Sequence, residues 1–180
     1  MKRWSWVLAA CMAAAPAFAG DVRFSEIHYA GDDGGPALGA NQYRNPVVAG
    51  FYPDPSAIRV GDDFYLVNST FGYFPGLPVF HSRDLVSWRQ IGNAIDRPDQ
   101  INYGDKDELT RGLFAPAISY NQDTFYIANT CFYCDGGNYI ITAKNPAGPW
   151  SDPVWLGFTG IDPSLFFDDN GTAWMLNNDV

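Results

Sequence analysis

The clearest candidate for chemistry is Asp54, which stands between two prolines immediately before an apolar run. Proline fixes its own φ and biases the residue before it toward extended geometry. Pro53 and Pro55 therefore predict a stiff, extended backbone that presents the carboxylate at the start of a strand. Carboxylates are the groups that general acid–base chemistry uses, although an isolated Pro-Asp-Pro can also be an ordinary proline-rich turn. Asp162 likewise stands directly before a proline, Pro163, and this recurrence makes the two aspartates candidates for one shared site.

The two aspartates belong to a local pattern that occurs three times, beginning at Asp54, Ala115 and Asp162. Each copy has an X-Pro step, a short apolar segment, a turn rich in Asp, Asn or Gly, and a second segment rich in aromatic and β-branched residues. This pattern is typical of a β-hairpin. In the first two copies a tryptophan follows at nearly equal distance, with Trp88 34 residues after Asp54 and Trp150 35 residues after Ala115.

The spacing of the copies indicates how the hairpins are arranged. They begin 61 and then 47 residues apart, and periods of about 40–50 residues with four strands each are typical of β-propeller blades. Blade starts lie at the central axis of such a wheel, so we expect Asp54 and Asp162 to reach one site from different blades. The predicted fold class is all-β, because no convincing amphipathic helix occurs and Pro and Gly interrupt the chain throughout.

The chain divides into three predicted segments. Residues 1–19 have a positive start, an apolar centre and an Ala-Phe-Ala end, which predicts a secretory signal peptide cleaved after Ala19. The residues ending at Cys11 also resemble a lipoprotein cleavage box. Residues 20–44 are interpreted as a flexible lead-in, and residues 45–180 as a partial β-propeller catalytic domain. The expected location is periplasmic or extracellular.

The composition and charge of the chain indicate which classes of binding partner are expected. The formal net charge is −9, and it becomes −11 when Lys2 and Arg3 leave with the predicted signal. The chain then carries a strong excess of acidic over basic residues, which does not suit binding to phosphate backbones, so nucleic acid is not an expected partner. No membrane span is predicted, because the signal is too short for one and no other stretch is suitable. Aromatic residues make up 16% of the chain and charged residues 17%, which suits a β-rich core with an aromatic site.

Phe71 and Phe114 are candidate substrate-binding residues. Phe71 is predicted to end the second strand of the first repeat, and Phe114 directly precedes the second repeat. In a propeller both could reach the central pocket. Aromatic faces beside carboxylates suit a sugar, whose C–H faces are apolar and whose rim carries hydroxyl groups.

Cys131 and Cys134 form a C-x-x-C motif between two predicted strands. Residues three apart in an extended chain are about 10 Å apart, beyond disulfide reach, so only a tight turn would allow the bond. A disulfide and two free thiols therefore both stay open. No second Cys/His cluster accompanies the motif, so no metal site is predicted. His81 begins a polar turn, where we expect packing or capping rather than catalysis.

Four ordered stretches together resemble glycoside hydrolase family 43, namely residues 45–56, 69–76, 81–88 and 160–165. The resemblance covers about residues 45–180. It implies a five-bladed β-propeller, of which this chain would supply about the first two and a half blades. It also implies a glycosidase of β-xylosidase or α-L-arabinofuranosidase type, acting on pentose-containing oligosaccharides or polysaccharides such as xylan.

The resemblance further implies inversion at the anomeric carbon by three acidic residues. Asp54 would be the general base, Asp162 would tune the pKa of the general acid and orient it, and a glutamate would be the acid. The chain has only Glu26 and Glu108, and neither stands at a repeat start. We therefore expect the acid to lie outside this chain, and the chain to be the N-terminal part of a larger enzyme and inactive alone.

The implied mechanism requires no cofactor, and a structural central ion such as calcium stays open. Two other classes of function also stay open, a non-catalytic carbohydrate-binding propeller and a secreted structural module. A glutamate at the start of a fourth repeat would favour the glycosidase over the binding module.

Overall fold

The computed structural model describes residues 37–103, 109–134 and 136–179. The predicted signal at 1–19 and most of the lead-in at 20–44 lie outside the described residues, as do both glutamates. Every strand of the described residues belongs to the unit of residues 39–180. The described residues are all-β, and they contain no helix long and apolar enough to cross a membrane.

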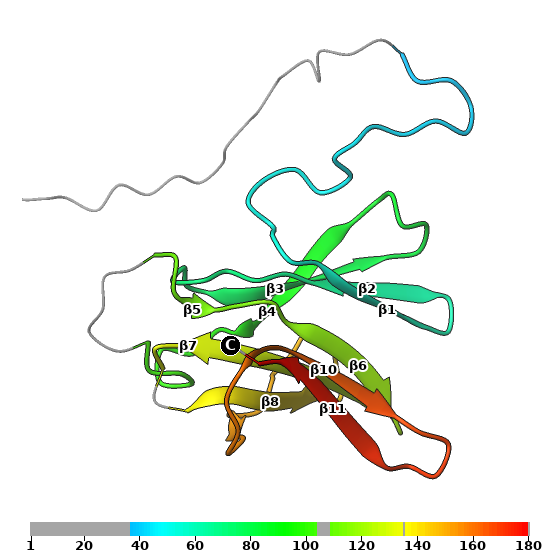
Figure 1. Ribbon diagram of the computed structural model, residues 1–180. Coiled ribbons are helices and arrows are strands. Elements are labelled where there is room, and N and C mark those ends of the chain that lie inside the picture. Colours follow the sequence, from blue (N-terminus) through cyan, green and yellow to red (C-terminus); the bar gives the residue numbers. More distant parts are fainter. Residues whose placement is uncertain (1–36, 104–108, 135, 180) are drawn as a thin grey trace, which may run out of the picture. The chain divides into compact units, whose positions relative to one another are not determined.

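The first repeat forms one four-stranded antiparallel sheet whose spatial order is its sequence order (Figure 1). Its strands are β1 (Ser56–Val60), β2 (Asp63–Val67), β3 (Gly76–Ser82) and β4 (Arg89–Ile95). The β1–β2 hairpin turns at Gly61, whose φ of 62° lies in the left-handed region that glycine adopts without strain. The predicted first hairpin is confirmed.

The second repeat forms the second sheet. Its strands are β5 (Gly112–Leu113), β6 (Ala117–Asn121), β7 (Thr124–Phe132), β8 (Gly137–Ala143) and β9 (Val154–Trp155). β6 to β9 pair in sequence order, while the short β5 pairs with the far end of β7. The β6–β7 turn has positive φ at both Gln122 (46°) and Asp123 (56°), as a type I′ hairpin requires.

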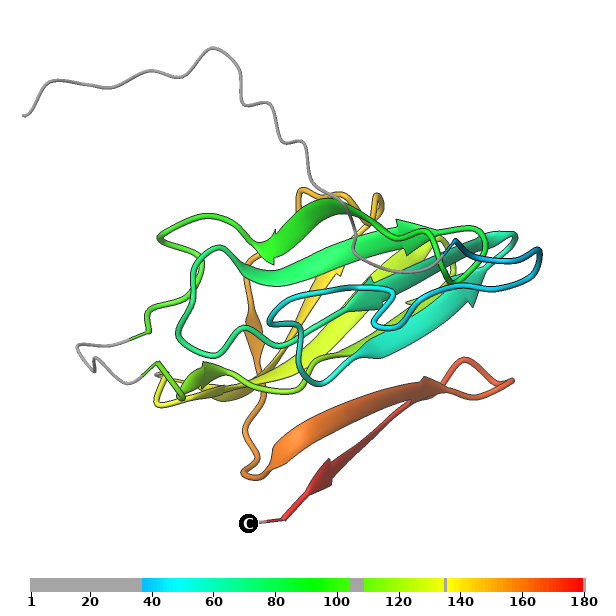
Figure 2. The ribbon, with the colours of Figure 1, turned by 90° about the horizontal axis from the view of Figure 1, so that it is seen from above.

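The third repeat contributes the β10 (Ile161–Phe167) and β11 (Ala173–Asn178) hairpin, which is also antiparallel. Asp168 closes its turn, because the carboxylate accepts hydrogen bonds from the Asn170 and Thr172 amides and from the Trp174 indole. In Figure 2 this orange and red hairpin lies to one side of the two larger sheets. All three predicted hairpins are therefore present.

The first strands of the three repeats meet, with β6 in contact with both β1 and β10 (Figure 1). The Ile118 amide of β6 donates to Ser56 Oγ of β1 at 3.1 Å, and Ser119 Oγ donates to the Leu165 carbonyl of β10 at 2.8 Å. The first strand of the second repeat therefore lies between the first strands of the other two, as expected for successive blades of a propeller.

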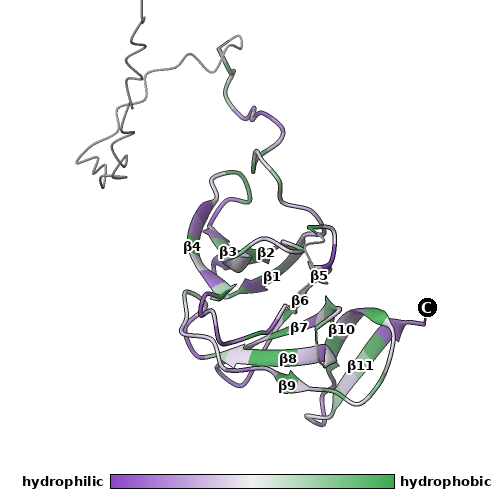
Figure 3. Ribbon diagram, turned by 90° about the vertical axis from the view of Figure 1, so that its left-hand side faces the viewer, coloured by the Kyte–Doolittle hydropathy of each residue, from purple (hydrophilic) through white to green (hydrophobic). Residues whose placement is uncertain are grey.

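The core lies between the first two sheets, and Figure 3 shows apolar residues along β7 and β8. Its fully buried side chains include Val67, Leu77, Val79, Ile95, Leu113, Ile127, Tyr139 and Ile141. Burial of apolar surface contributes roughly 25 cal/mol per Å², so this contact holds the two blades together. The rings of Tyr65 and Phe125 also meet across the blades, 5.0 Å apart in an edge-to-face contact.

The tryptophan landmarks have equivalent roles in the two repeats. The Trp88 indole donates to the Leu85 carbonyl at 3.0 Å, and the Trp150 indole donates to the Pro146 carbonyl at 3.2 Å. Each indole therefore closes the polar turn that precedes it. The two tryptophans occupy equivalent places in their repeats, in agreement with their similar distances from Asp54 and Ala115.

Candidate active site

Asp54 is exposed at the entrance to β1, but its backbone differs from the prediction. Its φ is 51°, in the left-handed region and not in the extended geometry that Pro53 and Pro55 favour. Aspartate tolerates this region better than most residues. Backbone contacts made by distant residues outweigh the local preference, because the Ser69 amide donates to the Pro53 carbonyl at 3.1 Å.

Asp162 adopts the same unusual backbone, with a φ of 56°, and it is also exposed. The pairing of β10 with β11 shifts register between Ile161 and Ser164, so Asp162 lies at an irregularity of the strand. Such irregularities redirect side chains and are common beside active sites. Non-glycine residues with positive φ also cluster at functional sites. The two aspartates thus share one local geometry in two repeats.

Asp54 is held by two residues that the sequence reasoning missed. Ser69 Oγ donates to Asp54 Oδ2 at 2.5 Å, which orients the carboxylate. The buried Asn68 donates through Nδ2 to the Tyr52 carbonyl at 2.9 Å and to the Pro53 carbonyl at 3.1 Å. The backbone before Asp54 is therefore fixed by the segment that follows β2.

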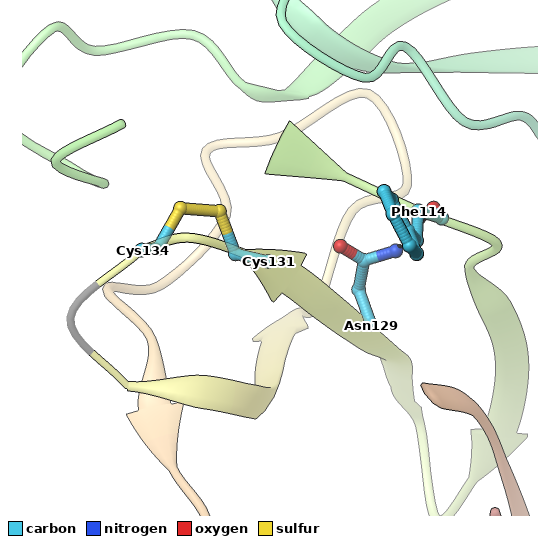
Figure 4. Close-up of a disulfide and its surroundings, with 4 residues drawn as sticks. All are labelled: Phe114, Asn129, Cys131 and Cys134. Carbon is cyan, nitrogen blue, oxygen red and sulfur yellow. Dashed lines mark hydrogen bonds between the residues drawn. A yellow bond between two sulfur atoms is a disulfide. The ribbon is translucent and has the colours of Figure 1, made fainter. Parts of the chain in front are cut away.

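The asparagine contact recurs in the other repeats. Asn129 Nδ2 donates to the Phe114 carbonyl at 2.6 Å, and Asn177 Nδ2 donates to the Thr159 carbonyl at 2.6 Å. Figure 4 shows Asn129 on β7 with its amide nitrogen toward Phe114. Asn68 and Asn129 each lie fourteen residues after a repeat start, so this spacing was a signal that could have identified them.

The structure brings the two predicted substrate-binding residues together. The rings of Phe71 and Phe114 meet at 5.6 Å, nearly edge to face. The prediction that Phe71 ends the second strand of the first repeat is wrong. β2 ends at Val67, and Phe71 lies beyond it in a β-bridge with Leu113. Gly112 permits that bridge, because a Cβ there would stand 2.5 Å from the Phe71 carbonyl oxygen.

Further aromatic rings extend this pair in both directions. The Phe51 ring lies 6.2 Å from Phe71 and 5.8 Å from Tyr73, and the Phe132 ring stacks on Phe114 at 5.0 Å. Tyr133 follows at 4.9 Å from Phe132. The signal for Phe132 was present in the sequence, since it lies seventeen residues after Ala115, as Phe71 does after Asp54.

Cys131 and Cys134 form a disulfide (Figure 4) with a Cα–Cα distance of 5.3 Å. This distance lies within the ordinary disulfide range. A tight turn brings the two residues together, with Tyr133 in the left-handed region at a φ of 71°. The tight turn that a disulfide between residues three apart requires is therefore present.

His81 has a packing and pairing role, as expected. Its Nε2 is hydrogen-bonded to Asp63 Oδ1 at 2.7 Å, and its ring lies 5.4 Å from that of Tyr65. The hydrogen bonds from His81 and then Arg83 lower the pKa of Asp63 below its ordinary value. Within residues 37–103, 109–134 and 136–179, no three His, Cys, Asp or Glu side chains gather to hold a metal ion.

Successive antiparallel sheets whose first strands contact one another in sequence order are typical of the blades of a β-propeller. Comparison with known proteins identifies the group. The model of the glycosyl hydrolases family 43 matches residues 43–180. The chain belongs to this family, which the resemblance of the four stretches indicated.

Two relatives show how far the similarity extends. The chain is 50% identical over 145 residues to the non-reducing end α-L-arabinofuranosidase BoGH43B of Bacteroides ovatus, covering 79% of this chain and 27% of that protein. It is 53% identical over 134 residues to a xylosidase/arabinosidase of Butyrivibrio fibrisolvens, covering 73% of this chain and 25% of that protein. The chain therefore spans about a quarter of the length of these relatives.

Solved structures agree on the fold. The GH43B structure of the Bacteroides ovatus xyloglucan locus matches 76% of this chain and 27% of its own, with a TM-score of 0.72 and 52% identity. A xylan β-1,4-xylosidase from Bacillus halodurans matches 74% of this chain and 27% of its own, with a TM-score of 0.69 and 44% identity. The structural neighbours are five-bladed β-propellers, so the predicted fold class is confirmed.

Proposed function

We propose that the whole protein is an exported, inverting glycoside hydrolase that releases xylose or arabinose from xylan-type oligosaccharides or polysaccharides. Family membership and the names of its relatives, which are xylosidases and arabinofuranosidases, support this proposal. The single observation that carries the assignment of the site is the shared geometry of Asp54 and Asp162. Both have left-handed backbone before a proline, and both belong to segments whose strands contact β6.

Asp54 is proposed as the general base. Ser69 occupies Oδ2, which leaves Oδ1 to accept a proton from a water molecule. The water oxygen then attacks the anomeric carbon as the bond to the leaving oxygen breaks. The general acid donates a proton to the leaving oxygen. Phe71 and Phe114 provide apolar faces for the sugar ring.

Asp162 is proposed to act on the general acid and not on the sugar. A negative charge near the acid raises its pKa by like-charge repulsion, which keeps the acid protonated while Asp54 is ionised. Inversion requires the base and the acid to stand about 6.5–9.5 Å apart. We propose that the acid lies in a part of the whole protein outside these 180 residues, since the relatives are about four times as long as the matched region.

The test uses the whole protein, assayed on an aryl β-xyloside and an aryl α-L-arabinofuranoside. Asp54→Asn should lower kcat by about 10²–10⁴-fold, because an amide cannot take the proton from water, while KM stays close to its original value. Asp162→Asn should lower kcat and move the basic limb of the pH–rate profile to lower pH, because the acid loses a neighbouring negative charge.

Asp62→Asn is the matched control, since Asp62 is an exposed aspartate in the β1–β2 turn, and it should leave kcat unchanged. The anomer released first, followed by NMR, separates inversion from retention. Full activity of Asp54→Asn would remove Asp54 from the mechanism. Binding of pentose oligosaccharides without turnover would favour the carbohydrate-binding alternative.

A further inference from the structure

A buried side chain of the second repeat, Asn138 on β8, holds the segment that leads to Asp162. Its Nδ2 donates to the Phe158 carbonyl at 3.2 Å and to the Gly160 carbonyl at 3.1 Å. Asn138 is only 1% exposed, and Gly160 stands two residues before Asp162. Moving the segment would leave a buried donor without a partner, which is costly. The two contacts therefore fix the course of the chain just before the carboxylate.

The orientation of the Asn138 amide follows from its partners. Carbonyl oxygens only accept hydrogen bonds, so the amide nitrogen must face the segment. On the other side, Thr130 Oγ1 donates to Asn138 Oδ1 at 2.6 Å. The backbone is held as well, because Asn138 pairs with Thr130 in the β7–β8 ladder and its carbonyl accepts from the Leu156 amide at 2.8 Å. The side chain thus projects from a fixed strand, which suits a positioning role.

Gly160 keeps the same segment close to β11. Its φ is 104°, in the region that favours glycine, and a Cβ there would overlap Asn177 Nδ2 and the Asn178 carbonyl oxygen. Asn177 Nδ2 also donates to the Thr159 carbonyl at 2.6 Å. The three successive carbonyls of residues 158–160 therefore all accept from side-chain amides, two of them from the second repeat and one from the third.

Asp162 is the single charged residue among the strands that pack together here. β10 pairs with β11 and contacts β6 and β7. The other titratable side chains of these four strands are Tyr120 on β6, and Tyr126 and the disulfide-bonded Cys131 on β7. A shift of the segment before β10 therefore moves one charged group, the Asp162 carboxylate.

We infer that Asn138 is a positioning residue for Asp162, so that a side chain of the second repeat sets the place of the third repeat's carboxylate. The inference rests on the proposed function, in which Asp162 acts on the general acid. The Asn138 amide holds the segment, and the segment fixes where the carboxylate stands relative to the acid. Because the interaction between charges weakens with distance, a carboxylate that moves away keeps the acid protonated less effectively.

The test measures pH–rate profiles of the whole protein on the aryl glycoside that it cleaves. Asn138→Ala removes both hydrogen bonds to the segment. It should lower kcat about 10- to 100-fold and move the basic limb to lower pH, in the same direction as Asp162→Asn and by no more than that variant. In the Asp162→Asn protein, Asn138→Ala should move the limb no further, because two changes that act through one group are not additive.

Asn138→Thr is the second variant, for use where Asn138→Ala folds poorly. It keeps a hydroxyl group that can pair with Thr130 but has no amide nitrogen, so it should move the basic limb in the same direction. Asn129→Ala is the matched control, because Asn129 is equally buried and holds a carbonyl outside this segment. It should lower the urea midpoint by a similar amount and leave the basic limb in place.

The possible outcomes separate the inference from the proposed function. An unmoved basic limb in both Asn138 variants, with Asp162→Asn still moving it, would overturn the inference and leave the proposed function intact. An equal shift in Asn129→Ala would also overturn the inference, because a general loss of stability would then be the cause. An unmoved limb in Asp162→Asn itself would overturn the proposed role of Asp162 and the inference with it.

Discussion

The first and second repeats have the same framework but different groups at their starts. In both, an asparagine fourteen residues after the start holds a backbone carbonyl just before it. The first repeat begins with Asp54, and Ser69 donates to its carboxylate. The second begins with Ala115, and the equivalent hydroxyl of Thr130 donates to Asn138 Oδ1 at 2.6 Å. The asparagine contact therefore forms whether the repeat begins with a carboxylate, as at Asp54, or with an alanine, as at Ala115.

The outer ends of the repeats differ in charge. In the first, the Asp63 carboxylate pairs with Arg83 at 2.9 Å and with His81. At the equivalent place in the second, Thr124 Oγ1 accepts a hydrogen bond from Lys144 Nζ at 2.7 Å. A contact that depends on a titrating acid in one repeat is therefore made by a hydroxyl group in the other.

The largest predicted difference between the repeats concerns their two hydroxyl groups. Ser69→Ala removes a hydrogen bond to a charged group, which contributes about 1.5–3 kcal/mol. It should lower kcat of the whole protein about 10- to 100-fold and also lower the midpoint of urea unfolding, because the same hydrogen bond stabilises the fold. Thr130→Ala should instead leave kcat nearly unchanged and lower the unfolding free energy by about 1–3 kcal/mol, because Asn138 Oδ1 loses its buried donor.

Ser69→Thr serves as the control for the first repeat, because it retains the hydroxyl group and should retain most of the rate. If Ser69→Ala and Thr130→Ala affected kcat equally, the functional distinction between the repeats would be lost.

A second prediction concerns the two asparagines. Asn68→Ala and Asn129→Ala should each lower the unfolding free energy by about 1–3 kcal/mol, since each leaves a backbone carbonyl without its donor. Their kinetic effects should differ. Asn68 holds the backbone before Asp54, so its loss should lower kcat, whereas Asn129 holds Phe114, so its loss should raise KM. Urea titration and steady-state kinetics on the same samples measure both effects, and identical kinetic changes would contradict the prediction.

The smallest prediction concerns pH. The pKa of Asp63 lies below its ordinary value of 3.8 because His81 and then Arg83 hydrogen-bond its charged form. The contact therefore contributes full stability above the ordinary pKa and loses it as the pH falls through the folded-state value. Asp63→Asn should flatten the acid side of a plot of urea midpoint against pH. Thr124→Val, the matched change in the second repeat, should shift that plot without changing its slope.

The sequence by itself determined the local architecture. Short apolar segments, X-Pro starts and turn residues predicted all three hairpins, and the spacing of Trp88 and Trp150 indicated that the first two repeats are equivalent. These features depend on neighbouring residues, so local propensity is sufficient to specify them. The four motif stretches also indicated the family. The roles of Asp54, Asp162, Phe71 and Phe114 stay predictions until the kinetic tests are made.

Only the tertiary structure decided how the site is assembled. The preference of a residue before proline gave the wrong backbone for Asp54, because contacts from Asn68 and Ser69 fix that segment in another conformation. The row of aromatic rings from Phe51 to Tyr133 joins two blades. The Cys131–Cys134 bond required a turn that the sequence left open. In each case the deciding energy comes from partners distant in the chain or from a backbone reversal, which residue order alone does not reveal.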